Sequence, residues 1–257
     1  MNSRQKNFYL LIILLVLFVS INYNFLDKFL TEKLISQNLV IVDRVIDGDT
    51  VQANETRYRL LGINAPEKGE KFSSEATDFL TGLVLNRSLK VEEYGEDLYG
   101  RKLAYFFIGS QNVNLLMVEN GLANVYILEN KIYEKEFFDS WEKCLDKNLN
   151  LCEKSLDICA NCLVVEELSS KEDFVILKNV CSYNCDLNGW EIKDEGRKKF
   201  VFEDFILEQK SNIRIFVSED CIGEGLCWKR GDYVWTDSGD TLFLRDAGGR
   251  LVLFYIY

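Results

Sequence analysis

Acidic, amide and arginine side chains lie close together in one short stretch of this chain, residues 45–67. They are Asp47, Asp49, Arg59, Asn64 and Glu67. Carboxylate and amide oxygens are the donors that calcium prefers, an arginine holds a phosphate through two parallel hydrogen bonds, and a glutamate can accept a proton from water. This combination indicates hydrolysis of a phosphodiester bond assisted by a hard metal ion. For the stretch taken alone, an ordinary hairpin with charged turns is the alternative.

These side chains converge only if the chain turns sharply between them. Asp47-Gly48-Asp49 lies between apolar extended runs, and Gly48 can take backbone angles that other residues resist, so the sequence predicts a hairpin here. The return run from Tyr58 to Ile63 has the composition of a strand. Pro66 is the only proline of the chain; it ends this strand and places Glu67 at a rigid corner.

A second group of motifs follows. It comprises Asp97-Leu98-Tyr99-Gly100-Arg101-Lys102-Leu103-Ala104-Tyr105, Asn114-Leu115-Leu116 and Gly121-Leu122-Ala123-Asn124-Val125-Tyr126. With the first stretch, these motifs resemble the staphylococcal nuclease (thermonuclease) family, whose signatures are an IDGDT-type turn, an R-x-x-x-x-D-x-P-E corner and a D-x-Y-G-R-x-L-A run. The resemblance covers about Leu39 to Asn148. A single short motif is weak evidence, whereas several in the family's order are strong evidence.

The resemblance implies a role for each matching residue. Arg59 and Arg101 correspond to the arginines that bind phosphate, and Glu67 to the general base. Tyr99 corresponds to the tyrosine beside the phosphate of the bound nucleotide, and its neighbour Lys102 is a further candidate for substrate binding.

The resemblance also implies a calcium site. Asp49 is the expected calcium carboxylate, Asp47 lies behind it, and the backbone carbonyl of Ala65 is a further ligand. The family commonly has a second carboxylate where this chain has Asn64, and a threonine where it has Ala65. Asn64 keeps an oxygen donor but removes one negative charge, so we expect calcium to bind more weakly rather than not at all.

The charge of the chain limits the kinds of site it can contain. The formal net charge is -11 and there is no histidine, which excludes histidine triads, histidine metal ligands and histidine bases. An acidic chain also binds nucleic acid poorly in a nonspecific way, because nonspecific affinity comes from neutralising the phosphates. Contact with phosphate must therefore be local, at Arg59, Arg101 and neighbours such as Lys71 and Lys102. This pattern favours an enzyme active site over a protein that binds nucleic acid tightly.

The N-terminus has the layout of an export signal. Arg4 and Lys6 precede an apolar run from Phe8 to Ile21, and no small-x-small cleavage site follows. We therefore expect residues 1–37 to form an uncleaved signal-anchor and stalk, with the catalytic region outside the cell membrane. A cleaved signal and a secreted protein are the alternative.

Eight cysteines follow the nuclease-like motifs: Cys144, Cys152, Cys159, Cys162, Cys181, Cys185, Cys221 and Cys227. In an exported chain an even number of cysteines favours disulfides. The alternative is a zinc site at Cys159-x-x-Cys162 and Cys181-x-x-x-Cys185. Spacing does not determine the pairing.

Strand and helix patterns predict two folded regions. Residues 38–150 read as short strands with inserted helices, in agreement with the family's five-stranded barrel of the oligonucleotide-binding type. Within them, Ser73 and Ser74 are predicted to cap one helix and Asn114 another. The stripe of Tyr133, Phe137, Phe138, Trp141 and Leu145 is predicted to be core rather than a surface for stacking bases.

After a cysteine-containing linker at residues 151–162, only short strands are expected. Leu163 to Tyr257 resembles the lamin-tail family, an immunoglobulin-like β-sandwich, through an L-K-N strand, an L-x-G-W strand and an S-G-D-T-L-x-L-x-D-x-x-G end. These motifs are structural, so no catalytic residue is assigned there and the partner of the sandwich is unknown. The whole chain is thus expected to be mainly β with helices.

The leading hypothesis is a calcium-dependent nuclease that cleaves DNA and RNA and, by resemblance, leaves 3′-phosphate ends. It would be anchored in the membrane by its N-terminal segment. The alternatives are a catalytically weak or inactive protein that binds nucleic acid, and a surface interaction protein in which the sandwich is the working part.

Overall fold

The computed structural model describes residues 5, 11–12, 18, 22, 38–127 and 132–257. The chain divides into two compact units, Met1–Leu39 and Val40–Tyr257. Most of the predicted signal-anchor and stalk therefore lies outside the described residues. Within the described part of the chain, no helix has the length and apolar run that crossing a bilayer requires.

Five strands close into a barrel. They are β1 (Asn38–Asp47), β2 (Thr50–Ala53), β3 (Thr56–Leu60), β5 (Ser88–Glu96) and β6 (Lys102–Ile108). Their order is β3-β2-β1-β5-β6, and a parallel pairing of β3 with β6 closes the ring. β7 (Gln111–Asn112) pairs antiparallel with β6, and β4 (Gly62–Asn64) pairs with β8 (Asn124–Tyr126). The predicted five-stranded barrel is confirmed.

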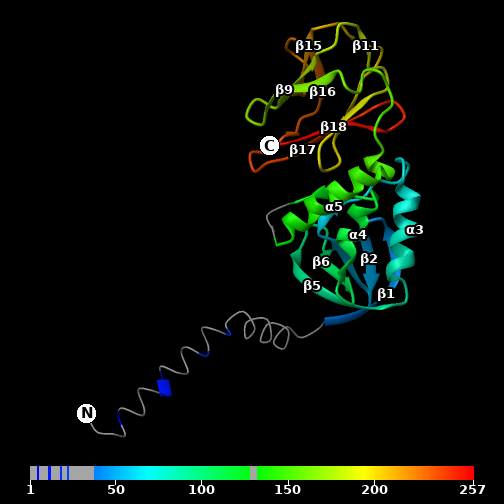
Figure 1. Cartoon of the computed structure of the whole chain (residues 1–257), viewed down its shortest axis with the longest axis vertical. Coiled ribbons are helices and arrows are strands. Elements are labelled where there is room, and N and C mark those ends of the chain that lie inside the picture. Colours follow the sequence, from blue (N-terminus) through cyan, green and yellow to red (C-terminus); the bar gives the residue numbers. More distant parts are fainter. Residues whose placement is uncertain (1–4, 6–10, 13–17, 19–21, 23–37, 128–131) are drawn as a thin grey trace. The chain divides into compact units, whose positions relative to one another are not determined.

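Three α-helices in residues 38–127 and 132–257 accompany the barrel: α3 (Ser73–Val84), α4 (Val113–Glu119) and α5 (Glu134–Lys147), followed by the 3-10 turn η1 (Asn150–Cys152). α4 packs against both α3 and α5 (Figure 1). On α5, Phe137 and Trp141 are buried in the barrel core, and Tyr133, Phe138 and Leu145 pack against it. The predicted core stripe is confirmed.

Both helix caps were predicted at the wrong residues. α3 begins at Ser73 itself, after Phe72 in a left-handed conformation, and has no side-chain cap. α4 is capped by Asn112, whose Oδ1 accepts hydrogen bonds from the amides of Asn114 and Leu115. Asn114 is fully buried instead, and its Nδ2 donates to the carbonyls of Leu61 and Ala104. Two asparagines in close succession could each be the cap, and local pattern did not separate them.

Residues 163–257 form a β-sandwich. One sheet has the order β16-β15-β10-β9 and the other β13-β12-β17-β18, with a small pair β11-β14. The strands are β9 (Leu163–Ser169), β10 (Phe174–Asn179), β11 (Cys185–Asp186), β12 (Glu191–Lys193), β13 (Lys199–Val201), β14 (Ile206–Leu207), β15 (Asn212–Ser218), β16 (Leu226–Lys229), β17 (Thr241–Arg245) and β18 (Leu251–Ile256). Trp190, Trp228 and Trp235 are buried in its core, which agrees with the predicted immunoglobulin-like architecture.

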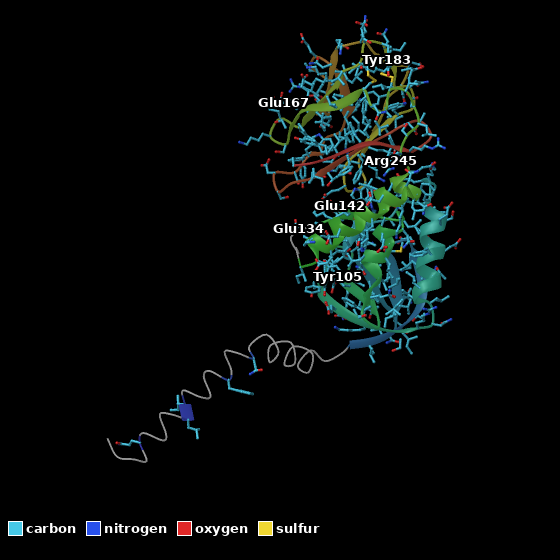
Figure 2. The ribbon with its side chains drawn as sticks, in the orientation of Figure 1. Tyr105, Glu134, Glu142, Glu167, Tyr183 and Arg245 are labelled. Carbon is cyan, nitrogen blue, oxygen red and sulfur yellow. A yellow bond between two sulfur atoms is a disulfide. The ribbon has the colours of Figure 1, made fainter. Side chains whose placement is uncertain are left out.

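The barrel and the sandwich share part of one core. Phe243 and Leu251, from sandwich strands, belong to the apolar cluster of the barrel. Phe243 lies edge-on to Trp141 of α5, with ring centroids 5.7 Å apart. Arg245, labelled in Figure 2, is buried beside them, and its Nη1 donates to the carbonyl of Leu151 at 2.6 Å. Because separating the two regions would expose these groups to water, the contact between them is a fixed part of the fold.

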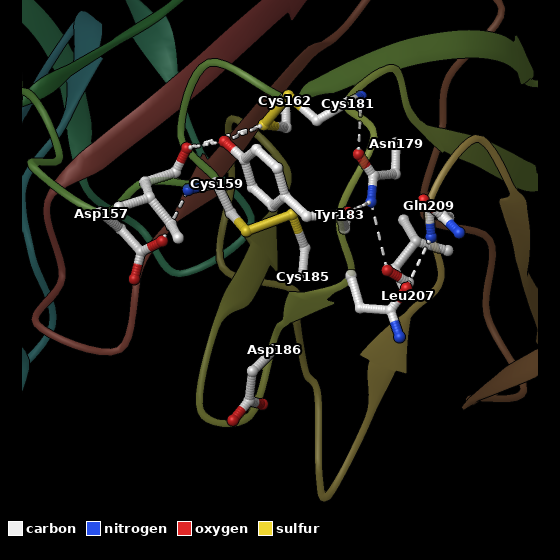
Figure 3. Close-up of a disulfide and its surroundings, with 12 residues drawn as sticks. Asp157, Cys159, Cys162, Asn179, Cys181, Tyr183, Cys185, Asp186, Leu207 and Gln209 are labelled. Atoms are coloured by element: carbon white, nitrogen blue, oxygen red, sulfur yellow. Dashed lines mark hydrogen bonds between the residues drawn. A yellow bond between two sulfur atoms is a disulfide. The ribbon is translucent and has the colours of Figure 1, made fainter.

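All eight cysteines are paired, and the predicted disulfides are confirmed over the zinc alternative. The pairs are Cys144–Cys152, Cys159–Cys185, Cys162–Cys181 and Cys221–Cys227. Figure 3 shows the Cys159–Cys185 and Cys162–Cys181 bridges with Tyr183 against them; its hydroxyl donates to the carbonyl of Ile158 at 2.9 Å. These two bridges tie the start of the sandwich to its interior.

The shared core predicts that the barrel and the sandwich unfold together. Replacement of Phe243 by alanine should lower the free energy of unfolding by about 3–5 kcal/mol and increase hydrogen exchange in barrel strands as well as in the sandwich. The matched control is Phe200→Ala, because Phe200 packs only against the sandwich core. A barrel whose exchange does not change in the Phe243→Ala protein would contradict a shared core.

Candidate active site

The turn between β1 and β2 places two aspartates. Asp47 Oδ1 accepts a hydrogen bond from the amide of Asp49 at 3.2 Å, which holds the turn. Gly48 is required for space: an added Cβ would lie 2.7 Å from Cβ of Ala65 and 2.8 Å from Cβ of Ala76. The sequence predicted that glycine was needed here for its backbone freedom. The structure shows instead that it is needed for space, since φ of Gly48 is not positive.

Arg59 is buried, and its guanidinium contacts three groups of the barrel. It lies opposite Thr50 in the β2–β3 register. Its Nη2 is 3.1 Å from Asp49 Oδ2 and donates to Asn64 Oδ1 at 3.1 Å, while its Nη1 donates to the carbonyl of Leu60 at 2.8 Å. Asp49 also accepts from the amide of Ala65 and the hydroxyl of Thr50. The guanidinium thus fixes the carboxylate and the amide relative to each other.

Burial sets the electrostatics of this pair. It raises the pKa of the Asp49 carboxyl, while Arg59, the Ala65 amide and the Thr50 hydroxyl oppose that rise. Burial lowers the pKa of the Arg59 guanidinium, and the charge of Asp49 opposes that change. A buried carboxylate held by a cation and two hydrogen-bond donors is a stable arrangement, whereas either group alone would be costly to bury.

The oxygen donors of the site fit calcium in their chemistry. Asp49 Oδ2 and Asn64 Oδ1 both lie 3.1 Å from the same nitrogen of Arg59, so the two oxygen donors lie close together and both are engaged by the guanidinium. Among the described residues, no group of three or more carboxylate, histidine or cysteine side chains is arranged to hold a metal. Carboxylate and amide oxygens are donors that calcium accepts, so the residue types remain compatible with the predicted weak calcium site.

Of the other predicted site residues, Arg101 and Tyr99 line the same cavity as Arg59 and Asn64, and Glu67 pairs with Arg197, which also lines it. Arg101 donates from Nε to Asp97 at 2.7 Å and from Nη1 to the Thr50 hydroxyl at 3.3 Å. Tyr99 is exposed, and its ring centroid lies 5.6 Å from the Arg101 guanidinium. Glu67 is partly exposed at the corner after Pro66, as predicted.

The structure does not bring the two predicted lysines to the site. Lys102 pairs with Glu93 at 2.8 Å and lies over the ring of Tyr58. Arg101 lines the cavity, whereas Lys102 does not. Lys71 donates to the carbonyl of Gly248 in the sandwich.

Sequence reasoning missed the hairpin turn between β12 and β13, residues 194–198. Asn64 Nδ2 donates to the carbonyl of Gly196 at 2.6 Å, and Arg197 Nε lies 2.6 Å from Glu67 Oε1. At the end of β12, Lys193 pairs with Glu70 at 2.8 Å. Nothing in the local pattern of the hairpin pointed to this contact, because it depends on how two separate regions meet.

A cavity of about 800 Å³ lies at this junction. Its barrel side includes Arg59, Asn64, Tyr99 and Arg101, and its sandwich side includes Arg197, Lys198, Arg230 and Tyr233. Asp194, Glu195 and Asp240 also line it. Burial and the neighbouring Asp240 raise the pKa of Glu195 to about 8, and burial raises that of Asp240 to about 6.

Comparison with known proteins identifies the family of the barrel. Residues 57–153 match the family described as staphylococcal nuclease homologue. The chain is also 32% identical over 123 residues to Protein ParB of Escherichia coli, an alignment that covers 43% of this chain and 70% of that protein. The chain belongs to the staphylococcal nuclease family. In this family member, residues 159–257 match the lamin tail domain, which agrees with the second resemblance.

Two further relatives of this staphylococcal nuclease family member carry nuclease names. Identity to the micrococcal nuclease of Shigella flexneri is 30% over 123 residues, covering 43% of this chain and 71% of that protein. Identity to an uncharacterized endonuclease of Escherichia coli O157:H7 is 38% over 90 residues. That match covers 33% of this chain and 59% of the relative, less than two thirds of its length.

The raised pKa of Glu195 predicts a pH-dependent stability. A carboxyl whose folded pKa is raised to about 8 stabilises the fold fully below its ordinary value of 4.5, and this contribution is lost as pH rises through about 8. Between about pH 5 and pH 9 the loss should be roughly 4 kcal/mol. Thermal unfolding of Glu195→Gln should lack this part of the pH dependence, whereas Glu208→Gln, on an exposed residue, should keep it. Identical pH profiles for wild type and Glu195→Gln would contradict the shift.

Proposed function

We propose that this protein is a calcium-dependent nuclease that hydrolyses phosphodiester bonds in DNA and RNA. The observation that carries the proposal is that Arg59, Asn64 and Arg101 line one cavity. Asp49 is bonded to Arg59 behind that lining, and Glu67 pairs with Arg197, which lines the same cavity. Membership of the staphylococcal nuclease family and relatives named as nucleases support the same chemistry.

The reaction is a displacement at phosphorus. Water attacks the phosphorus as Glu67 accepts its proton, and the bond from phosphorus to the 5′ oxygen breaks. The products carry a 3′-phosphate and a 5′-hydroxyl, the 5′ oxygen taking a proton from solvent. Arg101 reaches the site through Thr50 and faces the cavity, so its guanidinium can hold two oxygens of the phosphate as negative charge builds up.

Calcium would be held by the Asp49 carboxylate, the Asn64 amide oxygen and the backbone carbonyl of Ala65, with Asp47 behind them. When bound, calcium supplies positive charge that polarises the phosphate. Arg59 keeps Asp49 and Asn64 in register for that role. Calcium concentrations outside cells are sufficient for sites of millimolar affinity, so one direct carboxylate is compatible with turnover there.

A catalytically weak protein that binds nucleic acid is the second candidate. Its support is the single direct carboxylate and the ion pair between Glu67 and Arg197, which engages the proposed base. In that case calcium would change the affinity for an oligonucleotide without producing cleavage. The same calcium titration, followed both by binding and by product formation, separates the two candidates.

We further propose that the protein works outside the cytoplasm, either attached to the cell membrane through its N-terminal segment or secreted. Four disulfides support an oxidising compartment, and the basic and apolar N-terminal sequence supports export. Fractionation of cells that express the full chain tests this; recovery in the cytosol with reduced cysteines would contradict it.

Arg101 provides the sharpest test of the reaction. Replacement of Arg101 by alanine should lower kcat for cleavage of plasmid DNA and of RNA by about 100-fold or more, because one charged donor to the transition state is lost. The control is Lys90→Ala, which removes a cation that pairs with Glu92 away from the cavity. A calcium chelator should abolish wild-type cleavage. Undiminished cleavage in chelator, or by the Arg101→Ala protein, would contradict the proposed function.

A further inference from the structure

Two exposed tyrosines, each beside a cation, line the cavity from its two sides. On the barrel, Tyr99 is 83% exposed and the Arg101 guanidinium lies 5.6 Å from its ring centroid. On the sandwich, Tyr233 is 64% exposed and Lys198 Nζ lies 4.6 Å from its ring centroid. All four residues line the same cavity. Exposed aromatic rings combined with cations are the features that proteins use to bind single nucleic-acid strands, because bases stack on the rings and phosphates meet the cations.

The sandwich side of the cavity is held against the barrel and does not open as a lid. The side chain of Lys193 is only 8% exposed and pairs with Glu70 of the barrel, and Gly196 accepts the short hydrogen bond from Asn64. Strand β17, next to this hairpin in the sheet, places Phe243 in the barrel core. Moving the hairpin away would break these contacts together. A substrate that reaches Arg59 and Arg101 therefore meets the sandwich residues at the same time.

The cations on the sandwich side are available to a ligand. The Arg197 side chain is 57% exposed and pairs with Glu67. Arg230, with a side chain 34% exposed, makes a two-point pair with Asp232, which also pairs with Lys198. The exposed single-point pair of Arg197 is weak, and a phosphate can compete with Asp232 for the two-point contact of Arg230 because it offers the same paired oxygens. Arg59, by contrast, is fixed inside the barrel by Asp49, Asn64 and the carbonyl of Leu60.

The carboxylates of the cavity are already engaged within the sandwich. Asp240 Oδ1 accepts from the amides of Glu195 and Thr241, and Asp194 accepts from the amide of Lys198. Burial raises the pKa of all three carboxyls, Asp194, Glu195 and Asp240, and the pKa of Glu195, about 8, leaves that carboxyl mostly neutral near pH 7. The Glu195 carboxyl therefore adds little negative charge to the cavity that Arg197, Lys198 and Arg230 line.

We propose that the lamin-tail sandwich forms the second wall of the substrate site, where Lys198, Arg230 and Tyr233 hold the nucleotide next to the scissile phosphate of a single-stranded nucleic acid. Arg197 lies between the two walls beside Glu67 and contacts the same strand. The inference rests on the proposed nuclease function and names its preferred substrate: a strand whose bases are unpaired, since a base that stacks on Tyr233 must present its face.

The test uses the full chain and a labelled single strand of about 12 nucleotides, within the length that such grooves bind. Tyr233→Ala and Lys198→Ala should each raise KM for the single strand by about tenfold and leave kcat within about twofold, because they remove binding outside the reacting centre. Tyr233→Phe keeps the ring and should behave like wild type. Lys229→Ala, next in sequence to Arg230 but not lining the cavity, is the matched control and should also behave like wild type.

The salt dependence gives a second readout that a structural defect would not produce. Binding of the same strand in chelator should become less dependent on salt in the Lys198→Ala/Arg230→Ala protein, with the slope of log K against log salt reduced by about 1.4 for two lost phosphate contacts. For a blunt duplex of equal length, wild type and Tyr233→Ala should show the same KM. A larger KM effect on the duplex than on the single strand would overturn the single-strand assignment.

The outcomes separate this inference from the proposed function. In one outcome, wild type cleaves, Arg101→Ala does not, and Tyr233→Ala and Lys198→Ala bind and cleave as wild type does. That result would overturn the substrate-binding role of the sandwich and leave the proposed nuclease function supported. If wild type cleaves nothing but Tyr233→Ala and Lys198→Ala weaken binding of the single strand, the wall is supported and the proposed reaction is wrong. Thermal unfolding midpoints equal to that of wild type establish that each variant is folded.

Discussion

The buried guanidinium of Arg59 is the group on which the rest of the site depends. It joins β3 to the Asp49 turn and to Asn64 at the end of β4, and it does so inside the barrel, where each of these polar groups alone would be costly to bury. The barrel supplies the register that brings Thr50 opposite Arg59. One side chain thus determines where both oxygen donors point, and Arg101 joins the same network through Thr50.

Asn64 connects this centre to the second domain. Its Oδ1 accepts from Arg59 and its Nδ2 donates to Gly196 of the sandwich hairpin. An aspartate at this position, as the family commonly has, could accept from Arg59 but could not donate to a carbonyl. The amide therefore fits a nuclease barrel whose rim is covered by a sandwich. Asn64 therefore removes a metal-binding carboxylate expected from the family and adds a hydrogen bond between the two domains.

Features set by local sequence could be predicted, whereas those set by contacts between domains could not. The hairpin with Asp49 and Arg59, and the corner with Glu67, follow from residues close along the chain, and the family resemblance added Arg101. Lys102 was predicted at the site but pairs with Glu93 and does not line the cavity. Arg197 was missed altogether, since no pattern within the sandwich indicates which surface meets the barrel. Local patterns likewise did not decide between Asn112 and Asn114 as the cap of α4.

The central claim is that Arg59 holds the oxygen donors of a hydrolytic centre, and Arg59→Lys tests it most directly. Lysine keeps the charge but lacks the planar fork that reaches Asp49, Asn64 and the Leu60 carbonyl together. The measurement is the calcium titration of phosphodiester cleavage by wild type and by Arg59→Lys, each verified as folded by its unfolding transition. The account predicts cleavage by wild type and a kcat lowered by about 100-fold or more in the variant. Equal cleavage by the two folded proteins would contradict it.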